Sequence, residues 1–315
     1  MDLLKDIVLP SGYLDYSKIE KSEIVYKGTN GRNVERFYVS NSQSFIFKPL
    51  TNNSQLGKEI WIYDEVLPSL PPIYPRVFEK SISNVLNSNW IIFEDLGHLQ
   101  HQFNGEIATK MSKFIADWHS NSNISIKEKD SKGPKPFIED IVADLKVKRT
   151  EVLKSLPEHA LFLDFVYSFL EHFEFSKKMV FSHGDLHLGN YCIVQDRLVV
   201  LDWEHAHYNI PFWDLYHLLD MSHPLFPKEV SQKLREHVLD EYLNKVNIIE
   251  FTQDKDAFKK EYYVFAAVFS IWMISLIQGD LNRNDEKWPK DQLKNQLAET
   301  TSSFEQCVEQ LKKYC

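Results

Sequence analysis

Two short polar motifs on either side of one predicted hairpin constrain the fold of this chain more than any other feature. The first is His183–Asn190, with the sequence HGDLHLGN, and the second is Leu201–Glu204, with the sequence LDWE. The residues between them alternate as two short strands around a polar turn. Because a hairpin returns the chain to where it began, we expect Asp185, Asn190 and Asp202 to converge at one end of it.

Carboxylates and an amide oxygen that meet in this way suit phosphoryl transfer from ATP. That reaction needs one carboxylate to orient the attacking hydroxyl and accept its proton, and it needs oxygen ligands that hold Mg²⁺ on the phosphates. The spacing of the two motifs therefore favours a phosphotransferase.

The N-terminal part of the chain has the pattern of an antiparallel sheet. Residues 23–47 alternate with a period of two, which predicts three strands, and residues 90–93 indicate another strand. Between them, residues 54–67 carry apolar side chains three and four positions apart, which predicts an amphipathic helix. These elements would form a small first lobe.

After residue 96 the pattern becomes helical. Apolar positions at helical spacing predict a helix over 107–119, and residues 230–311 are helical by pattern. Residues 121–136 are polar and contain Gly and Pro, so we interpret them as a surface loop. The change of pattern predicts two domains, residues 1–95 and residues 96–315.

The charge and hydropathy of the chain bear on its partners. Acidic residues outnumber basic ones by 45 to 36, which gives a net charge of −9. A protein that binds the phosphate backbone needs clustered Lys and Arg, so we do not expect nucleic acid as a partner. The stretch Tyr262–Gln278 is uncharged, but it is short for a bilayer span and contains Ser and Gln. We interpret it as a buried helix and expect no membrane partner.

Cysteine use and the first residues bear on localisation. Cys192, Cys307 and Cys315 form neither a CxxC pair nor an even-numbered set, so the sequence indicates neither a zinc site nor a disulfide framework. The acidic residues within Met1–Asp6 do not fit the basic start of a secretory signal. We therefore expect a reducing, cytoplasmic compartment.

HGDLHLGN followed by LDWE resembles the aminoglycoside phosphotransferase and choline kinase family, which are small-molecule relatives of the protein kinases. Protein kinases carry HRDxxxxN and DFG at nearly the same separation. Gly184 in place of Arg, and Trp203-Glu204 in place of Phe-Gly, favour the small-molecule branch. The resemblance implies an α+β, bilobal protein-kinase-like fold, with a small antiparallel-sheet N-lobe and a larger, mainly helical C-lobe.

The resemblance also implies roles for the motif residues. Asp185 would be the catalytic base, and Asn190 and Asp202 would hold Mg²⁺. The nucleotide would be ATP, with GTP as the other candidate. The acceptor would be a small hydroxylated molecule such as an aminoglycoside or a choline-like amino alcohol.

Further roles follow from the family order of the first lobe. Lys48 would contact the phosphates and pair with Glu59, which we prefer over Glu65 because the family places its glutamate early in this helix. The backbone of Asp95 and Leu96 would face the adenine.

The resemblance assigns roles to five other residues. Gly28 and Gly31 flank a short glycine-containing turn, shorter than the full GxGxxG loop, which would lie near the phosphates. His183 would brace the catalytic loop, and Asp214 would support it. Glu204 is the candidate for the acceptor: together with other acidic residues near the loop, it favours a cationic acceptor.

Alternative functions remain open from the sequence. His183, Asp185 and His187 could be the alternating metal ligands of a hydrolase, since residues two apart on an extended chain share a face. The chain could also be a non-catalytic scaffold that keeps the kinase fold for binding. A protein kinase is disfavoured, because the segment between Asp202 and Asp214 is too short for a long activation segment. The sequence does not indicate an oligomeric state.

Overall fold

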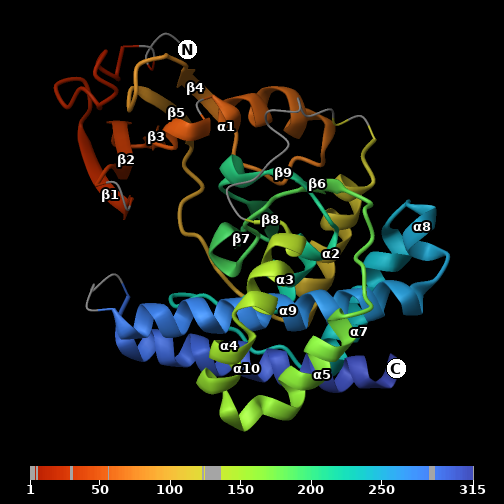
Figure 1. The fold of residues 1–315 in the computed structure, drawn as a ribbon. Helices are drawn as coiled ribbons and strands as arrows, with labels where there is room; N and C mark the ends of the chain where they lie inside the picture. Colours follow the sequence, from red (N-terminus) through yellow and green to blue (C-terminus); the bar gives the residue numbers. More distant parts are fainter. Residues whose placement is uncertain are drawn as a thin grey trace. The chain divides into compact units, whose positions relative to one another are not determined.

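The computed structural model describes residues 4, 6–28, 31–55, 57–122, 124, 136–283 and 288–314. The chain forms two compact units, Met1–Gln100 with Cys192–Glu204, and His101–Tyr191 with His205–Cys315. The division at residue 95 stays a prediction, and the sequence pattern did not reveal that Cys192–Glu204 groups with the N-terminal unit. Most of the predicted loop over 121–136, and Thr29 and Asn30 of the glycine-containing turn, lie outside the described residues. The two units are described separately below (Figure 1).

A five-stranded antiparallel sheet forms the centre of the first unit (Figure 1). Its strands follow the order β1-β2-β3-β5-β4. Their bounds are Lys21–Lys27 for β1, Asn33–Ser40 for β2, Gln43–Leu50 for β3, Val77–Ser81 for β4 and Asn89–Glu94 for β5. The strands expected over 23–47 and 90–93 are confirmed as β1, β2, β3 and β5. Strand β4 was not predicted, because all five of its residues are half-buried and show no alternation.

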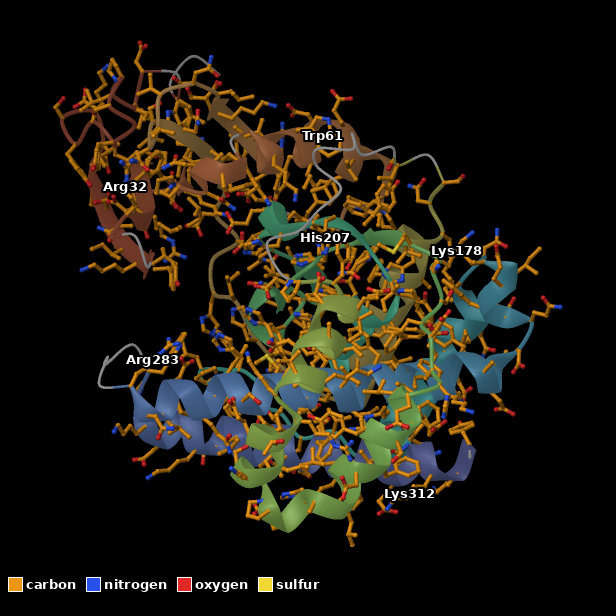
Figure 2. The ribbon with its side chains drawn as sticks, in the orientation of Figure 1. Arg32, Trp61, Lys178, His207, Arg283 and Lys312 are labelled. Atoms are coloured by element: carbon orange, nitrogen blue, oxygen red, sulfur yellow. The ribbon has the colours of Figure 1, made fainter. Side chains whose placement is uncertain are left out.

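The helical segment after β3 is less regular than the sequence pattern suggested. It consists of a short α1 (Lys58–Trp61), a wider π-helical turn (Ile62–Val66) and a 3-10 turn (Leu67–Ser69). Trp61, labelled in Figure 2, ends α1. Ile60, Tyr63 and Leu67 of the predicted apolar face are buried, and the Tyr63 ring lies 5.1 Å from the Phe93 ring on β5, so this face packs on the sheet.

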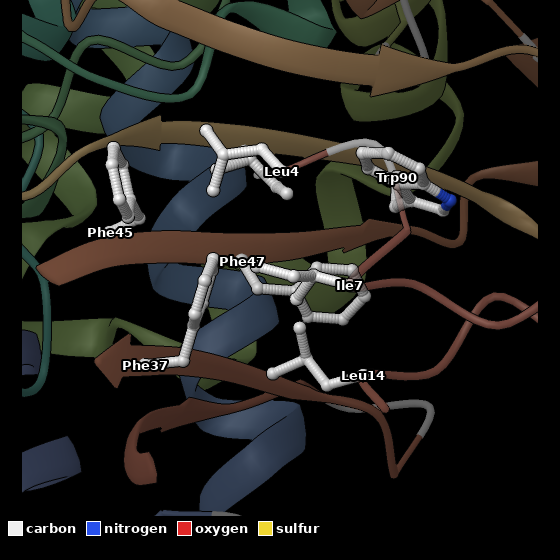
Figure 3. Packing of buried hydrophobic residues seen from close by; sticks show 8 residues of the cluster. Leu4, Ile7, Leu14, Phe37, Phe45, Phe47 and Trp90 are labelled. Carbon is white, nitrogen blue, oxygen red and sulfur yellow. The ribbon is translucent and has the colours of Figure 1, made fainter. Parts of the chain in front are cut away.

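Aromatic and aliphatic side chains pack together beneath this sheet, and Figure 3 shows their cluster. Phe37, Phe45 and Phe47 come from β2 and β3, and the rings of Phe37 and Phe45 lie 5.7 Å apart. Leu14 from the N-terminal segment packs against the same cluster. The residues before β1 therefore cover one face of the sheet and complete its core.

A hairpin of β7 (Tyr191–Val194) and β8 (Arg197–Val200) supplies the late part of the first unit. The backbones of Ile193 and Gln100 exchange hydrogen bonds of 3.0 and 3.2 Å, and the N–H of Val200 donates to the carbonyl of Ile73 at 2.6 Å. These bonds attach the hairpin to the N-terminal part of the chain, so they also fix the position of Asp202, which follows β8.

The second unit is mainly helical. Its strands β6 (Val180–Ser182) and β9 (His207–Asn209) pair antiparallel, and residues 183–190 follow β6 directly. Its helices are α2 (Gly105–His119), α3 (Ile138–Val147), α4 (Arg149–Ser155), α5 (Ala160–Leu170), α6 (Phe212–Leu219), α7 (Gln232–Lys245), α8 (Ile249–Thr252), α9 (Lys255–Asn282) and α10 (Lys290–Leu311). Helix α6 lies at the centre of the unit, since all eight of its residues are buried.

Helices α9 and α10 form a long antiparallel pair along one side of the second unit (Figure 1). Arg283 at the end of α9 and Lys312 just after α10 lie at opposite ends of this pair in Figure 2. By length and composition alone α9 could cross a membrane. Its residues from Tyr262 to Ile271 are nevertheless all buried within the unit. They pack as the core helix of a globular domain would.

Candidate active site

A lysine held between two carboxylates is the central feature of the first unit. Lys48 lies on β3, and its Nζ is 2.8 Å from both carboxylate oxygens of Glu59 on α1. The same Nζ is 2.7 Å from Oδ1 of Asp202. Three segments far apart in the sequence thus converge on one ammonium group. The lysine pairs with Glu59, as predicted, rather than with Glu65.

Burial and charge act against each other in this cluster. Burial alone would lower the pKa of Lys48, but the charges of Asp202 and Glu59 raise it well above its ordinary value, so the lysine stays protonated. The Glu59 side chain is only 4% exposed. Its burial and the neighbouring charges of Asp202 and Glu204 raise its pKa, although Lys48 opposes this.

Glu204 belongs to the same cluster. Ligand atoms of Glu59, Asp202 and Glu204 all lie within 4.8 Å of one another. Three carboxylates around a single lysine leave an excess of negative charge that a cation would neutralise. Carboxylate oxygens are the ligands that Mg²⁺ prefers. The residues present therefore fit a magnesium site here, and Glu204 is a possible ligand that the sequence had suggested only for the acceptor.

The backbone of Asp202 has the left-handed conformation, with φ of 60°. This conformation is uncommon for a residue other than glycine, and aspartate is among the residues that tolerate it best. A residue held in this way at the end of a strand is often functional.

The loop of residues 183–190, for which the sequence predicts a catalytic role, lies in the second unit between β6 and β7. We refer to it as the catalytic loop. The Asn190 side-chain nitrogen donates to the backbone carbonyl of Asp185 at 2.7 Å and lies 3.4 Å from its Oδ2. The backbone N–H of Asp185 donates to Nδ1 of His183 at 3.2 Å. Asp185 is therefore held from both sides, and Asn190 has its side-chain oxygen left to offer a cation.

Asp214 on α6 anchors the start of this loop. It is completely buried and accepts hydrogen bonds from five groups. These are Ser182 Oγ at 2.6 Å, His183 N at 2.8 Å, Gly184 N at 3.1 Å, Trp118 Nε1 at 3.0 Å and His119 Nε2 at 3.3 Å. Burial alone would raise the pKa of Asp214, but these bonds and the nearby histidines hold it well below the usual range.

Gly184 has a structural reason to be glycine. Its φ is 83°, and a Cβ placed there would lie 2.2 Å from the carbonyl oxygen of His205 and 2.8 Å from Nδ1 of His207. The arginine that protein kinases carry at this position would not fit without moving the backbone.

Two histidines lie next to Asp185; the sequence placed His187 beside it only as a metal ligand of the rival hydrolase, and it did not place His217 there. Nε2 of His187 lies 3.7 Å from Asp185 Oδ2, and Nε2 of His217 lies 3.8 Å from Oδ1. Nδ1 of His187 accepts from the N–H of Gly189, and Nδ1 of His217 donates to the carbonyl of Trp213. The position of His217 one turn after Trp213 and Asp214 on the buried helix α6 was a signal that could have located it.

The remaining predicted residues lie in the first unit. The Asp95 side chain accepts from Arg36 Nε at 2.7 Å and from Ser44 Oγ at 2.7 Å, which fixes the end of β5 where Leu96 follows. Gly28 and Gly31 close the turn between β1 and β2, with Gly31 N donating to the Gly28 carbonyl at 2.9 Å.

The predicted residues are thus divided between the units. The first unit holds Lys48, Glu59, Asp202, Glu204, Asp95, Leu96, Gly28 and Gly31, and the second holds Asp185, Asn190, His183 and Asp214.

Comparison with solved structures supports the kinase-like fold. Choline kinase from Cryptosporidium parvum aligns with a TM-score of 0.59 at 14% identity, covering 95% of this chain and 92% of that one. Spectinomycin phosphotransferase in complex with ADP and spectinomycin aligns with a TM-score of 0.56 at 13% identity, covering 91% and 94%. Amicoumacin kinase in complex with AMP-PNP and Ca²⁺ aligns with a TM-score of 0.57 at 16% identity, covering 92% and 89%. At these identities the likeness establishes the fold.

Sequence comparison gives the family. No curated protein matches the sequence. Residues 90–251, which make up just over half of the chain and include both polar motifs, match the model of the phosphotransferase enzyme family (APH). The chain therefore belongs to the phosphotransferase enzyme family.

Proposed function

We propose that the chain is a kinase that transfers the γ-phosphate of ATP to a hydroxyl group of a small molecule, with GTP as the alternative donor. The observation that carries this proposal is the Lys48 ammonium group between Glu59 and Asp202. A lysine fixed by a buried glutamate at this place in a kinase-like fold is suited to bind the nucleotide phosphates. Two of the similar solved structures hold ADP and AMP-PNP, which supports a nucleotide as the ligand.

Mg²⁺ is the proposed cofactor. Asp202, Asn190 and Glu204 are the residues that would hold it, because they offer the oxygen atoms that this cation prefers. When bound, Mg²⁺ would neutralise charge on the phosphates of the nucleotide. The excess of carboxylates around Lys48 supports this assignment.

Asp185 is the proposed catalytic base. Its carboxylate would orient the acceptor hydroxyl and take up its proton while the oxygen attacks the phosphate. Asn190 and His183 would act as positioning residues, since both bind the Asp185 backbone. Asp214 would support them by holding the backbone of His183 and Gly184.

The other assignments are proposals of the same kind. The backbone of Asp95 and Leu96 would face the adenine, and Gly28 and Gly31 would lie near the phosphates. The expected location is the cytoplasm, which suits the buried free thiols of Cys192 and Cys307.

The rival metal-dependent hydrolase has less support. Among the residues that the structure describes, the three-residue group with ligand spacing is Glu59, Asp202 and Glu204, not the histidine-containing set. His183 and His187 also each use Nδ1 to accept a backbone N–H within the loop. These bonds give both histidines a structural role.

The test is release of ADP from Mg²⁺-ATP in the presence of a panel of hydroxylated small molecules, together with nucleotide binding followed by thermal unfolding. Saturating Mg²⁺-ATP should stabilise the protein by about 3 kcal/mol at 100 times Kd. Asp185→Asn should retain this stabilisation and lose turnover, whereas Asp202→Asn should lose both.

Asp291→Asn, at an exposed position on α10, is the control and should behave as the wild type. The proposal fails if neither ATP nor GTP raises the melting temperature. Equal loss of binding in the Asp185 and Asp202 variants would contradict the roles given to these two residues.

A further inference from the structure

A continuous group of half-buried rings, which also includes His101 at 4.9 Å from Phe226, lies next to the proposed catalytic base in the second unit. His187 and His223 stack with their centroids 4.5 Å apart and an interplanar angle of 12°. Phe226 lies 5.3 Å from His223, and Trp288 meets His223 edge-on at 5.5 Å. We refer to His187, His223, Phe226 and Trp288 as the ring platform.

The ring platform is built directly on the catalytic loop. His187 is two residues from Asp185, and its Nε2 lies 3.7 Å from the Asp185 carboxylate. At Gly189 a Cβ would lie 2.6 Å from the Phe226 ring and 2.7 Å from the His187 ring. The loop therefore has glycine where two rings press against its backbone.

The platform differs from an ordinary hydrophobic core. All four rings are half-buried, whereas the core rings of this unit, such as Trp213 and Phe269, are fully buried. The platform joins segments that are remote in sequence: the catalytic loop, the turn after α6 and the residue pair before α10. Partly exposed rings beside a catalytic carboxylate are suited to bind a ligand.

We propose that the ring platform binds the acceptor and that the acceptor carries a flat aromatic ring next to the hydroxyl served by Asp185. This inference rests on the proposed kinase function. Aromatic pairs in stacked or edge-on geometry gain about 0.5–1.5 kcal/mol beyond the burial of their surface, so such a platform selects for planarity. A saturated ring of the same size would bury similar area without that gain.

The charges around the platform favour an aromatic acceptor over a cationic one. Trp, Tyr and Phe are the rings that attract cations, and half of this platform is imidazole. Among the residues that the structure describes, two acidic side chains of this unit are engaged in other contacts. Asp214 accepts five hydrogen bonds, and Asp220 is paired with the buried Arg235 at 2.7 Å and accepts from Ser303 at 2.6 Å. A polycationic acceptor would need carboxylates that these two residues do not have available.

The experiment measures the binding of matched probes to the full chain by NMR titration, with and without Mg²⁺-AMP-PNP. The probes are 2-naphthylmethanol, its fully saturated analogue decahydronaphthalene-2-methanol, and choline. We expect the aromatic alcohol to bind about three- to tenfold more tightly than the saturated one, which corresponds to the energy of one ring contact. We also expect it to bind more tightly than choline.

Substitutions show which residues cause the preference for the aromatic alcohol. His223→Leu and Trp288→Leu should each remove most of the preference for the aromatic over the saturated alcohol. His237→Leu, an exposed histidine on α7, and Phe165→Leu, a half-buried ring on α5, are the matched controls and should keep it. The ratio of the Kd values for the two alcohols does not change when less protein is folded, so it separates a change in recognition from a structural defect.

Equal binding of the two alcohols by the wild type, or tighter binding of choline, would overturn the inference. So would an unchanged preference in both platform variants. Failure of the kinase proposal would look different, because the protein would then neither release ADP nor be stabilised by Mg²⁺-ATP. The preference for the aromatic over the saturated alcohol can be measured without nucleotide, so it would still test the ring platform.

Discussion

Asp214→Asn is the sharpest test of how the catalytic loop is held. The two carboxylate oxygens of Asp214 accept from different donors: Oδ2 accepts from Trp118, His119 and the His183 backbone, and Oδ1 accepts from Ser182 and the Gly184 backbone. An asparagine can keep its oxygen where Oδ2 accepts from Trp118, His119 and His183. Its amide nitrogen then faces the N–H of Gly184, so two hydrogen-bond donors point at each other.

The cost can be worked out from these contacts. A buried N–H without an acceptor costs about 1–3 kcal/mol, and each bond that loses its charged partner is weakened further. We expect the free energy of unfolding in urea at pH 7 to fall by about 3 kcal/mol. The control Asp291→Asn removes a carboxylate that is 94% exposed and should change stability by less than about 0.5 kcal/mol.

The pH dependence follows from the low pKa of folded Asp214. Because the folded pKa lies below the ordinary value of 3.8, this carboxylate stabilises the folded state above that value and loses its contribution as the pH falls further. Burial lowers the pKa of His119, although its hydrogen bond with Asp214 and the charge of Asp214 oppose this shift. The difference in free energy of unfolding between the wild type and Asp214→Asn should therefore be constant from pH 7 to pH 5. It should become smaller below about pH 4. A loss under about 1 kcal/mol at pH 7, or a difference that grows in acid, would refute this account.

Two further substitutions test the site. Lys48→Met should raise the Kd for Mg²⁺-ATP at least about tenfold, because one charge-assisted contact contributes about 1.5–3 kcal/mol. Isothermal titration calorimetry measures this Kd. The control Lys80→Met, which breaks an exposed pair with Asp64, should leave it unchanged. Gly184→Ala should lower the free energy of unfolding by more than about 2 kcal/mol, because its Cβ would meet the His205 backbone in a left-handed conformation; Gly279→Ala on α9, where a Cβ has open space, is the control, and equal urea midpoints for the two variants would contradict the argument.

Local patterns predicted the elements whose two faces differ. Strands β2 and β3 alternate between buried and half-buried residues, so a period of two was visible in the sequence. Strand β4 has no such contrast and follows a proline-rich connector, so nothing marked it. The helix over 54–67 had the right apolar face, but its π-helical turn depends on packing against the sheet and leaves no signature in residue order.

Site residues could be predicted where they belong to a sequence motif whose residue types suit the reaction. Lys48, Glu59 and Asp202 come from three separate segments, and the resemblance to a family supplied the link that no local pattern could. The ring platform had no such link. His187, His223 and Trp288 each lie in a short irregular segment, where a lone ring has no periodic partner. Their association depends on long-range contacts made only when α6, α10 and the catalytic loop are packed.

Glu204 has two candidate roles. It is the last residue of the LDWE motif, and from the sequence its carboxylate is a candidate contact for a cationic acceptor. The structure groups it with Lys48 and Glu59 in the first unit, while Asp185 and the ring platform belong to the second. An extra carboxylate beside a lysine and two other carboxylates strengthens the attraction for a divalent cation. In our proposal the acceptor is selected by the ring platform instead. If this division holds, Glu204→Gln should weaken Mg²⁺-dependent nucleotide binding and leave the preference for aromatic over saturated alcohols unchanged.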